Sequence, residues 1–261
     1  MDYKKINKKT WDQKTDVHIA SEFYDMAAFR AGKNALNEIE LPLLGDVSGK
    51  SILHLQCHFG QDSLSLARMG AQVTGIDLSD KAIQRATELS EELHIPAKFV
   101  CCDVYDTREH ITETFDIVFA SYGTIIWLPD LDKWASVIAA SLKPGGRFVF
   151  AEFHPVIWMF DNAFKDITYS YFNVEPIVET ISGTYADRGA NLVQQSVTWN
   201  HALGEVLGAL LRQGLQIKQF QEFDYSPYPV FGERNEFKPG KFRITGFGNR
   251  LPLVYALEAV K

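Results

Sequence analysis

The sequence is poor in cysteine and has no long apolar run. Its three cysteines, Cys57, Cys101 and Cys102, are odd in number and two of them are neighbours, so they predict no disulfide framework. No stretch approaches the roughly 18 consecutive apolar residues of a membrane-spanning helix, and the opening residues lack the apolar core of a signal peptide. These features favour a cytoplasmic protein with no membrane partner, in which Cys101 and Cys102 are small buried hydrophobic residues rather than nucleophiles.

Positive charge is also in short supply. The chain has 26 Lys and Arg against 33 Asp and Glu, a net charge of -7, which gives no field that would attract nucleic acid. One basic cluster, Lys4, Lys5, Lys8 and Lys9, lies within the first ten residues. We interpret it as a frayed or solvated terminus, with contact to an acidic partner as the alternative. We expect no nucleic-acid partner.

The remaining composition is that of an ordinary folded protein with many aromatic residues. Of 261 residues, 46% are hydrophobic, 23% are charged and 13% are aromatic. This length predicts one large domain, or one domain with an insertion. We expect a monomer or a homodimer.

The order of the predicted elements indicates the fold class. Apolar, β-rich runs alternate with helical patterns such as Ala82, Ala86, Leu89 and Leu93. The runs cover residues 51–57, 72–77, 98–103, 115–121 and 147–153. Strands separated by helices pair in parallel, so the pattern predicts an α/β protein with a doubly wound sheet and helices on both faces.

The flanking segments differ from this alternation. Residues 7–44 have an amphipathic helical pattern, and residues 154–199 are aromatic-rich with weak periodicity, too long for a simple connection. A helix over about 201–212 and strands over 216–223 and 252–260 complete the chain. We therefore divide it into a helical lid, 1–45, and a main domain, 46–261, which contains an aromatic cap insertion, 154–199, and a strand-linking loop, 224–250.

A strand, a tight turn and a helix followed by Asp77 predict a nucleoside site. Asp77 lies 21 positions after Gln56, and an acidic residue at this spacing can accept hydrogen bonds from both ribose hydroxyls. A dinucleotide needs glycines where the pyrophosphate approaches the turn, but Gln56 and His58 occupy two of these positions. The pattern favours a cofactor without phosphate over NAD(P).

Four motifs together resemble those of class I S-adenosylmethionine-dependent methyltransferases: HLQCHFG (54–60), GIDLSD (75–80), CCDV (101–104) and LKPGGRFVFAEF (142–153). The resemblance covers roughly residues 46–155. It implies a Rossmann-like sheet of seven strands with the last strand antiparallel, and S-adenosyl-L-methionine as the cofactor. The chain departs from the family pattern at His54, which replaces an acidic residue, and at Gln56 and His58, which replace glycines.

The resemblance also implies candidate site residues. The predicted cofactor-binding residues are Gln56, Cys57, His58, Gly60, Asp77, Leu78, Ser79, Asp103, Val104 and Ser121. His154, directly after the fifth strand, is the candidate general base, and a structural role beside Pro155 is the alternative. Tyr122, the second candidate catalytic residue, and Trp127 are expected to form the substrate wall or to pack in the core. N-terminal helices often cover the cofactor in the family, which makes Trp11, His18 and Tyr24 candidates to close the site.

No metal site is predicted, because strand alternation turns Cys57 away from His54 and His58.

The residues after the fourth strand argue against two classes of methyl acceptor. Ser121 to Thr124 do not form the Asn/Asp-Pro-Pro-aromatic motif of nucleic-acid base methyltransferases, and no glutamate pair typical of protein arginine methyltransferases occurs between Phe119 and Pro129. The predicted activity is in-line methyl transfer to a small molecule. The alternatives are a non-catalytic sensor of the cofactor or its demethylated product, and an NAD(P)-dependent oxidoreductase.

Overall fold

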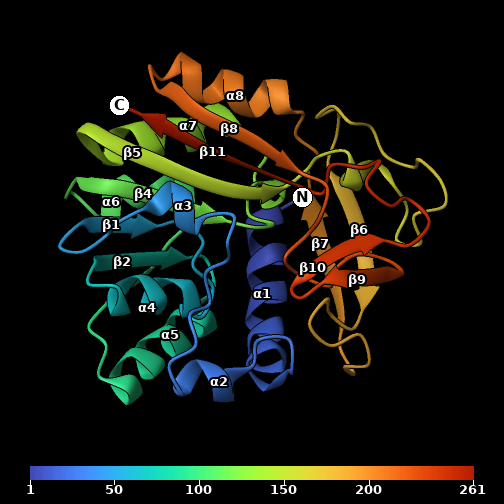
Figure 1. Cartoon of the computed structure of the whole chain (residues 1–261), viewed down its shortest axis with the longest axis horizontal. Helices are drawn as coiled ribbons and strands as arrows, with labels where there is room; N and C mark the ends of the chain where they lie inside the picture. Colours follow the sequence, from blue (N-terminus) through green and yellow to red (C-terminus); the bar gives the residue numbers. More distant parts are fainter.

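A seven-stranded sheet forms the centre of the protein, whose computed structural model describes residues 1–261 (Figure 1). The strand order is β3-β2-β1-β4-β5-β11-β8. Strands β1 to β5 pair in parallel, and β11 is antiparallel to both β5 and β8. The strands are β1 Ser51–His54, β2 Gln72–Asp77, β3 Lys98–Cys101, β4 Phe115–Ser121, β5 Leu142–Phe153, β8 Gln216–Phe223 and β11 Val254–Val260. The predicted fold class, including the antiparallel last strand, is confirmed.

Helices cover both faces of the sheet, as a parallel sheet with two apolar faces requires. The helices after β1 are α4 Gln61–Arg68, α5 Asp80–Leu93, α6 Thr107–His110, α7 Leu131–Ser141 and α8 Leu203–Arg212. On one face, Trp134 of α7 and Leu210 of α8 pack in a core with Phe148 of β5. On the other, Leu66 of α4 packs with Ile52 of β1. None of the helices has the length and apolar character needed to cross a membrane.

The N-terminal segment contains a long helix, α1 Tyr3–Ala20, and two short ones, α2 Met26–Arg30 and α3 Leu41–Leu44. The predicted lysine cluster lies in the ordered helix α1, where Lys5 and Lys9 are exposed to solvent as expected but Lys4 and Lys8 form ion pairs within the protein. The Lys4 ammonium lies 2.7 Å from the Asp103 carboxylate, and Lys8 contacts both Asp12 and Asp80. The lysines at positions 4 and 8 share one helix face, which meets acidic residues beside the ends of β2 and β3.

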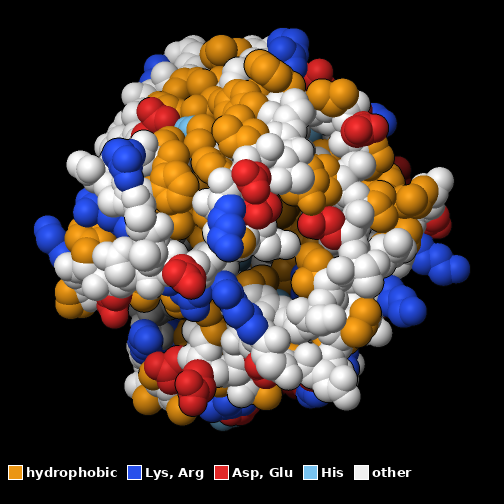
Figure 2. Space-filling model, turned by 90° about the vertical axis from the view of Figure 1, so that its right-hand side faces the viewer, with side chains coloured by type: hydrophobic (Ala, Val, Ile, Leu, Met, Phe, Trp, Pro, Cys, Tyr) orange, Lys and Arg blue, Asp and Glu red, His pale blue; other side chains and the backbone are white.

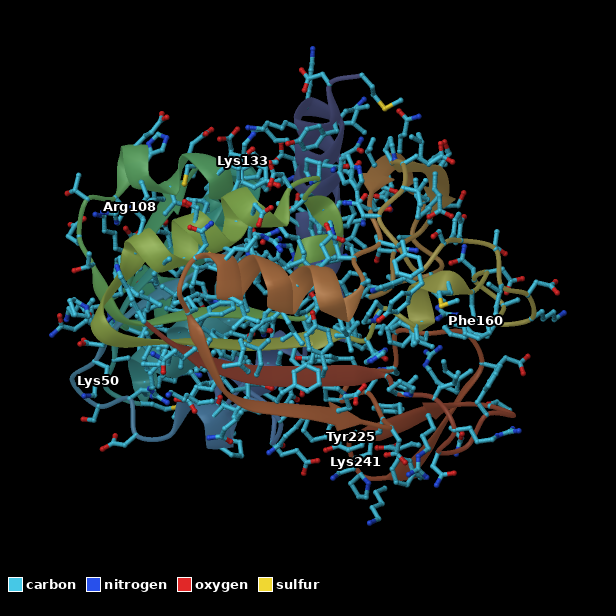
Figure 3. The ribbon with its side chains drawn as sticks, turned by 90° about the horizontal axis from the view of Figure 1, so that it is seen from above. Lys50, Arg108, Lys133, Phe160, Tyr225 and Lys241 are labelled. Atoms are coloured by element: carbon cyan, nitrogen blue, oxygen red, sulfur yellow. The ribbon has the colours of Figure 1, made fainter.

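Two hairpins form a cap beyond the carboxyl ends of the sheet strands. The first pairs β6 Ile177–Ser182 with β7 Val193–Thr198, and the second pairs β9 Arg234–Lys238 with β10 Lys241–Ile244. The second lies in the segment 224–250, which we expected to be a loop. Helix α1 runs between the sheet and the cap (Figure 1). Seen from above, Phe160 marks the cap, and Lys50, before β1, lies at the opposite end of the molecule (Figure 3).

Candidate cofactor and acceptor site

A cavity of about 1200 Å³ lies where β1, β2 and β4 end, bounded by α1 and the cap. Ligand sites for one small molecule have volumes of roughly 300–1,000 Å³, so this cavity has room for a cofactor and an acceptor together. Seen from the cap side, the surface is hollowed near its centre, with acidic and basic side chains around the opening (Figure 2). The position agrees with the rule that ligands of open α/β sheets bind at the carboxyl ends of the strands.

The turn after β1 keeps a glycine-like backbone although two of its residues carry side chains. Gln56 has φ +53° and His58 has φ +51°, both in the left-handed region, as does Gly60 at +84°. This conformation costs a residue other than glycine about 1–2 kcal/mol. A Cβ on Gly60 would come within 2.9 Å of the Phe99 ring, so glycine is needed there for packing as well as for its φ. Such strained positions occur most often at functional sites.

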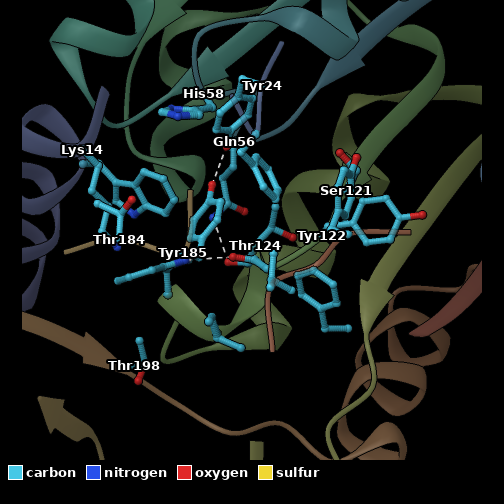
Figure 4. A pocket seen from close by; sticks show the side chains of 18 of the residues that line it. Lys14, Tyr24, Gln56, His58, Ser121, Tyr122, Thr124, Thr184, Tyr185 and Thr198 are labelled. Carbon is cyan, nitrogen blue, oxygen red and sulfur yellow. Dashed lines mark hydrogen bonds between the residues drawn. The ribbon is translucent and has the colours of Figure 1, made fainter. Parts of the chain in front are cut away.

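Hydrogen bonds hold this turn in place. The Gln56 side-chain amide donates to the Thr124 carbonyl at 2.9 Å (Figure 4). The backbone N–H of His58 donates to Asp77 Oδ2, also at 2.9 Å. Gln56 Oε1 is buried and has no hydrogen-bond partner within the protein. The turn is therefore tied to the ends of both β2 and β4, and it offers an unused acceptor atom.

Asp77 is a half-buried carboxylate that no cation neutralises. Its second oxygen, Oδ1, accepts a hydrogen bond from the Ser79 N–H at 2.9 Å. Burial raises the pKa of Asp77 to about 6, although backbone N–H donors, including those of Ser79 and His58, act in the opposite direction. Since a carboxylate has about four acceptor sites, each oxygen can still accept a ligand hydroxyl. Asp103, at the end of β3, accepts from the Tyr105 N–H at 2.8 Å and carries the ion pair with Lys4.

Helix α1 closes one wall of the cavity over this turn. His18 Nδ1 and His58 Nε2 lie 3.0 Å apart and are joined by a hydrogen bond. Burial lowers the pKa of His18 to about 2 and that of His58 to about 3, so both imidazoles are neutral at pH 7. Trp11 and Tyr24 line the cavity, whereas His18 lies behind His58, and the Tyr24 hydroxyl is hydrogen-bonded to that of Tyr185. The structure thus brings two of the three predicted closing residues, Trp11 and Tyr24, to the cavity wall.

Two acids near the end of β4, the buried Glu40 and the half-buried Asp62, were not identified from the sequence. Ser121 Oγ donates to Asp62 Oδ2 at 3.0 Å, and the Tyr122 hydroxyl donates to Glu40 Oε2 at 2.7 Å. Burial raises the pKa of Asp62 to about 6 and that of Glu40 to about 7. Asp62 follows the turn directly at the start of α4, but Glu40 comes from the loop before α3, where no sequence signal connects it to β4.

Glu152 of β5 fixes the loop that carries Tyr122. Its fully buried carboxylate accepts hydrogen bonds from the backbone N–H groups of Gly123, Thr124, Ile125 and Phe153 and from the Thr124 hydroxyl. Tyr122 itself has φ +38°. A carboxylate that gathers this many donors locks the loop, and with it the position of the Tyr122 ring.

The structure separates two predicted site residues from the cavity. His154 Nε2 is hydrogen-bonded to Glu222 at 2.9 Å and its Nδ1 accepts from the Val156 N–H at 3.2 Å, so neither nitrogen is free to act as a base. Ser79 Oγ accepts from the Ala82 N–H as the N-cap of α5 and donates to Asp12. Neither of these two residues lines the cavity. The predicted site residues that do line it are Gln56, Cys57, His58, Gly60, Asp77, Leu78, Asp103, Val104, Ser121 and Tyr122.

His54, which replaces the acidic residue expected at this position, also forms a hydrogen bond within the protein. Its Nδ1 lies 2.7 Å from Ser63 Oγ, and burial lowers its pKa to about 3. The chain contains no group of three or more His, Cys, Asp or Glu side chains that could hold a metal ion.

Residues 52–146 are similar in sequence to known methyltransferases. The family model described as "Methyltransferase domain" matches residues 52–146. The chain is 28% identical over 153 residues to phosphoethanolamine N-methyltransferase 1 of Triticum aestivum, covering 57% of this chain and 30% of that protein. It is 30% identical over 137 residues to a ubiquinone biosynthesis O-methyltransferase of Photorhabdus laumondii, covering 51% and 57%. The chain thus spans less than two thirds of the length of these relatives.

Solved structures share the fold over most of the chain. An S-adenosylmethionine-dependent methyltransferase from Clostridium acetobutylicum has a TM-score of 0.58 at 13% identity, covering 97% of this chain and 98% of that chain. Magnesium protoporphyrin IX methyltransferase from Synechocystis, solved with bound SAH, has a TM-score of 0.53 at 16% identity and covers both chains fully. At these identities the likeness establishes the fold.

Proposed function

We propose that this chain is a class I S-adenosylmethionine-dependent methyltransferase and that it transfers the cofactor's methyl group to a small molecule bound in the same cavity. The observation that carries the proposal is the glycine-like turn 56–60 on the cavity wall. This turn is hydrogen-bonded to Asp77, a carboxylate that has no cationic partner. A volume of about 1200 Å³ supports simultaneous binding of both reactants.

The residues present fit the proposed cofactor. Asp77 can accept hydrogen bonds from the ribose hydroxyls, and Asp103 can accept one from the adenine amino group if Lys4 gives up part of its ion pair. Gln56 Oε1, buried without a partner, can accept a hydrogen bond from the methionyl ammonium. When bound, the cofactor supplies a methyl group activated by a positively charged sulfur. The protein then has to align the acceptor and exclude water, which can contribute roughly 7–11 kcal/mol.

Tyr122 and Glu40 provide a route for the acceptor's proton. Because the Tyr122 hydroxyl donates to Glu40, its oxygen lone pairs remain available to the acceptor. As the acceptor loses its proton to Tyr122, the Tyr122 proton passes to Glu40, whose pKa of about 7 suits a proton acceptor at neutral pH. We propose this pair in place of His154, because both nitrogens of that histidine are hydrogen-bonded outside the cavity.

The acceptor is proposed to be a small aromatic or amine compound. The cavity wall includes Tyr24, Tyr122, Tyr185 and Tyr228, which suit an apolar ring or a cation. The relatives named above are an N-methyltransferase and an O-methyltransferase, so the test must include acceptors that are methylated on nitrogen and on oxygen.

Three free cysteines and a net charge of -7 support a cytoplasmic protein that does not act on nucleic acid. We retain the prediction of a monomer or homodimer, with the N-terminal segment as a lid.

Calorimetric titration and a transfer assay test this proposal. Purified protein is titrated with S-adenosylmethionine, S-adenosylhomocysteine and NAD, and then incubated with methyl-labelled cofactor and a panel of phenols, carboxylic acids and amines. We expect micromolar binding of the first two ligands, no binding of NAD, and label transfer to at least one panel member. Binding of NAD alone would contradict the proposal, and cofactor binding without transfer across the panel would favour the sensor.

A further inference from the structure

Lys14 is the one buried lysine or arginine of the chain, and it lies in α1 on the cavity wall. Its side chain and backbone together are 6% exposed. Figure 4 shows it in the same cavity as His58, Gln56 and Tyr185. A buried cation is expensive, because the desolvation of its ammonium must be offset by a counter-charge or by hydrogen bonds.

The fold supplies no such counter-charge. No carboxylate lies within ion-pair distance of the Lys14 ammonium, in contrast to Lys4 and Lys8 of the same helix. Its neighbours are the ring faces of Trp11 at 4.8 Å and Trp127 at 5.1 Å. Burial alone lowers its pKa to about 8, so the group is still largely protonated at pH 7. Two aromatic faces offset only part of the desolvation, and an anion is the missing partner.

The position of Lys14 on α1 directs it toward the cap. Asn7 Nδ2 donates to the Val197 carbonyl and Thr10 Oγ1 donates to the Gln195 carbonyl, both in β7. Lys14 follows these residues at helical spacings of seven and four, so it lies on the same face of α1. Lys4 and Lys8, which contact the acids beside β2 and β3, lie on another face. Lys14 therefore points to the space between the turn and the cap, away from the acids that would hold the nucleoside.

We propose that Lys14 binds an anionic group, a carboxylate or phosphate, of the methyl acceptor, so that the aromatic or amine acceptors proposed above are those that also carry an acid group. This inference rests on the proposed function, since it assumes an acceptor in this cavity. The Lys14 charge also acts on the neighbouring His58, in the turn assigned to the methionyl end. The anion that pairs with Lys14 could therefore also be the methionyl carboxylate of the cofactor. The experiment must distinguish an anionic group of the acceptor from this carboxylate.

The test compares Lys14→Met with Lys14→Arg and with Lys9→Met, which removes an exposed charge from the same helix. Benzoate and inorganic phosphate are titrated into each protein, alone and saturated with S-adenosylhomocysteine. At least one anion should bind the wild type and lose tenfold or more of its affinity in Lys14→Met, with less than a threefold change in the other two variants. If neither anion binds the wild type, or if both bind Lys14→Met equally well, the inference fails.

The cofactor source is tested with S-adenosylhomocysteine and 5′-methylthioadenosine, which lacks the amino-acid part. We expect the ratio of their affinities to be unchanged in Lys14→Met. A tenfold loss for S-adenosylhomocysteine alone would assign the contact to the cofactor and overturn the inference about the acceptor. If S-adenosylhomocysteine does not bind the wild type, the proposed function fails, while the anion titrations without it still test Lys14.

Thermal unfolding supplies a readout that needs no ligand. Methionine has a similar shape without the charge, so Lys14→Met should raise the midpoint of unfolding if the ammonium has no partner in the fold. Lys9→Met should leave the midpoint within about a degree. A lower midpoint for Lys14→Met would mean that the ammonium has a stabilising partner within the protein, and it would contradict the inference.

Discussion

The backbone N–H of His58 donates a 2.9 Å hydrogen bond to the carboxylate of Asp77. This bond joins the turn after β1 to the end of β2, so the residue expected to bind the ribose also holds the turn expected to line the methionyl group. The same carboxylate has acceptor capacity left for a ligand. Cofactor affinity and the geometry of the turn therefore depend on one side chain.

Replacing Asp77 should weaken cofactor binding more than folding. In Asp77→Asn, one oxygen still accepts a backbone hydrogen bond but the charge is lost, and a hydrogen bond to a charged group contributes roughly 1.5–3 kcal/mol. We expect the Kd of S-adenosylhomocysteine, measured by calorimetry, to rise tenfold or more. Asp80→Asn, which removes an exposed carboxylate outside the cavity, is the control and should change it less than threefold. Equal affinities in the two variants would mean that the nucleoside binds elsewhere.

The left-handed backbone at Gln56 can be tested by comparing two truncations. Gln56→Ala and Gln56→Gly both lose the hydrogen bond to Thr124, but only glycine adopts φ +53° without strain. After allowance for the greater flexibility of glycine in the unfolded chain, Gln56→Gly should be more stable by roughly 0.5–1 kcal/mol. Urea unfolding measures this difference. An alanine variant of equal or greater stability would show that position 56 is not left-handed in solution.

His18 should make the protein sensitive to acid. Its pKa is about 2 in the folded protein, whereas an unfolded histidine titrates near 6.5. Below pH 6.5 the unfolded state binds more protons at this site, so stability falls as the pH falls through this range toward 2. At pH 5 the loss for this group is about 2 kcal/mol.

The control for this effect is His18→Gln, which cannot titrate. Denaturant unfolding at pH 7 and pH 5 gives the loss of stability on acidification for each protein. Asp62 and Asp77 have raised pKa values and titrate in both, so they cancel in the comparison. The wild type should lose about 2 kcal/mol more than the variant. Identical losses would indicate that His18 is exposed or protonated in the folded state.

The environment of His154 predicts a structural role. It is 3% exposed and is hydrogen-bonded through both nitrogens. We expect His154→Ala to lower the free energy of unfolding by about 1–3 kcal/mol, because a buried side chain and both of its hydrogen bonds are lost. Methyl transfer by the folded variant should stay within threefold of the wild type. A hundredfold loss of kcat in a folded His154→Ala protein would restore the histidine as the base.

Tyr122 should matter for turnover instead. Tyr122→Phe keeps the ring but removes the hydroxyl between the acceptor and Glu40, so kcat should fall tenfold or more while the Kd of S-adenosylhomocysteine changes less than threefold. Tyr169→Phe, which removes a hydroxyl bonded to Glu179 of the cap, is the control. An unchanged kcat in Tyr122→Phe would exclude the proposed proton route.

Local patterns predicted the sheet and the strand-end acids well, because these depend on sequence periodicity and on a spacing within one βαβ unit. The segments at 51–57 and 216–223 became β1 and β8, and Asp77 reached the cavity. Contacts between distant segments could not be read in this way. Glu40 meets Tyr122 across 82 positions, and the partners of His154 are set by packing of β8 beside β11. The cap strands also lacked a clear alternation of apolar and polar residues.

The most direct test of the central claim is a crystal structure of the protein with S-adenosylhomocysteine. We predict that both ribose hydroxyls lie within hydrogen-bond distance of the Asp77 carboxylate and that the methionyl part lies along residues 56–60. A nucleoside bound away from Asp77, or a dinucleotide with its pyrophosphate over the turn 56–60, would contradict the account.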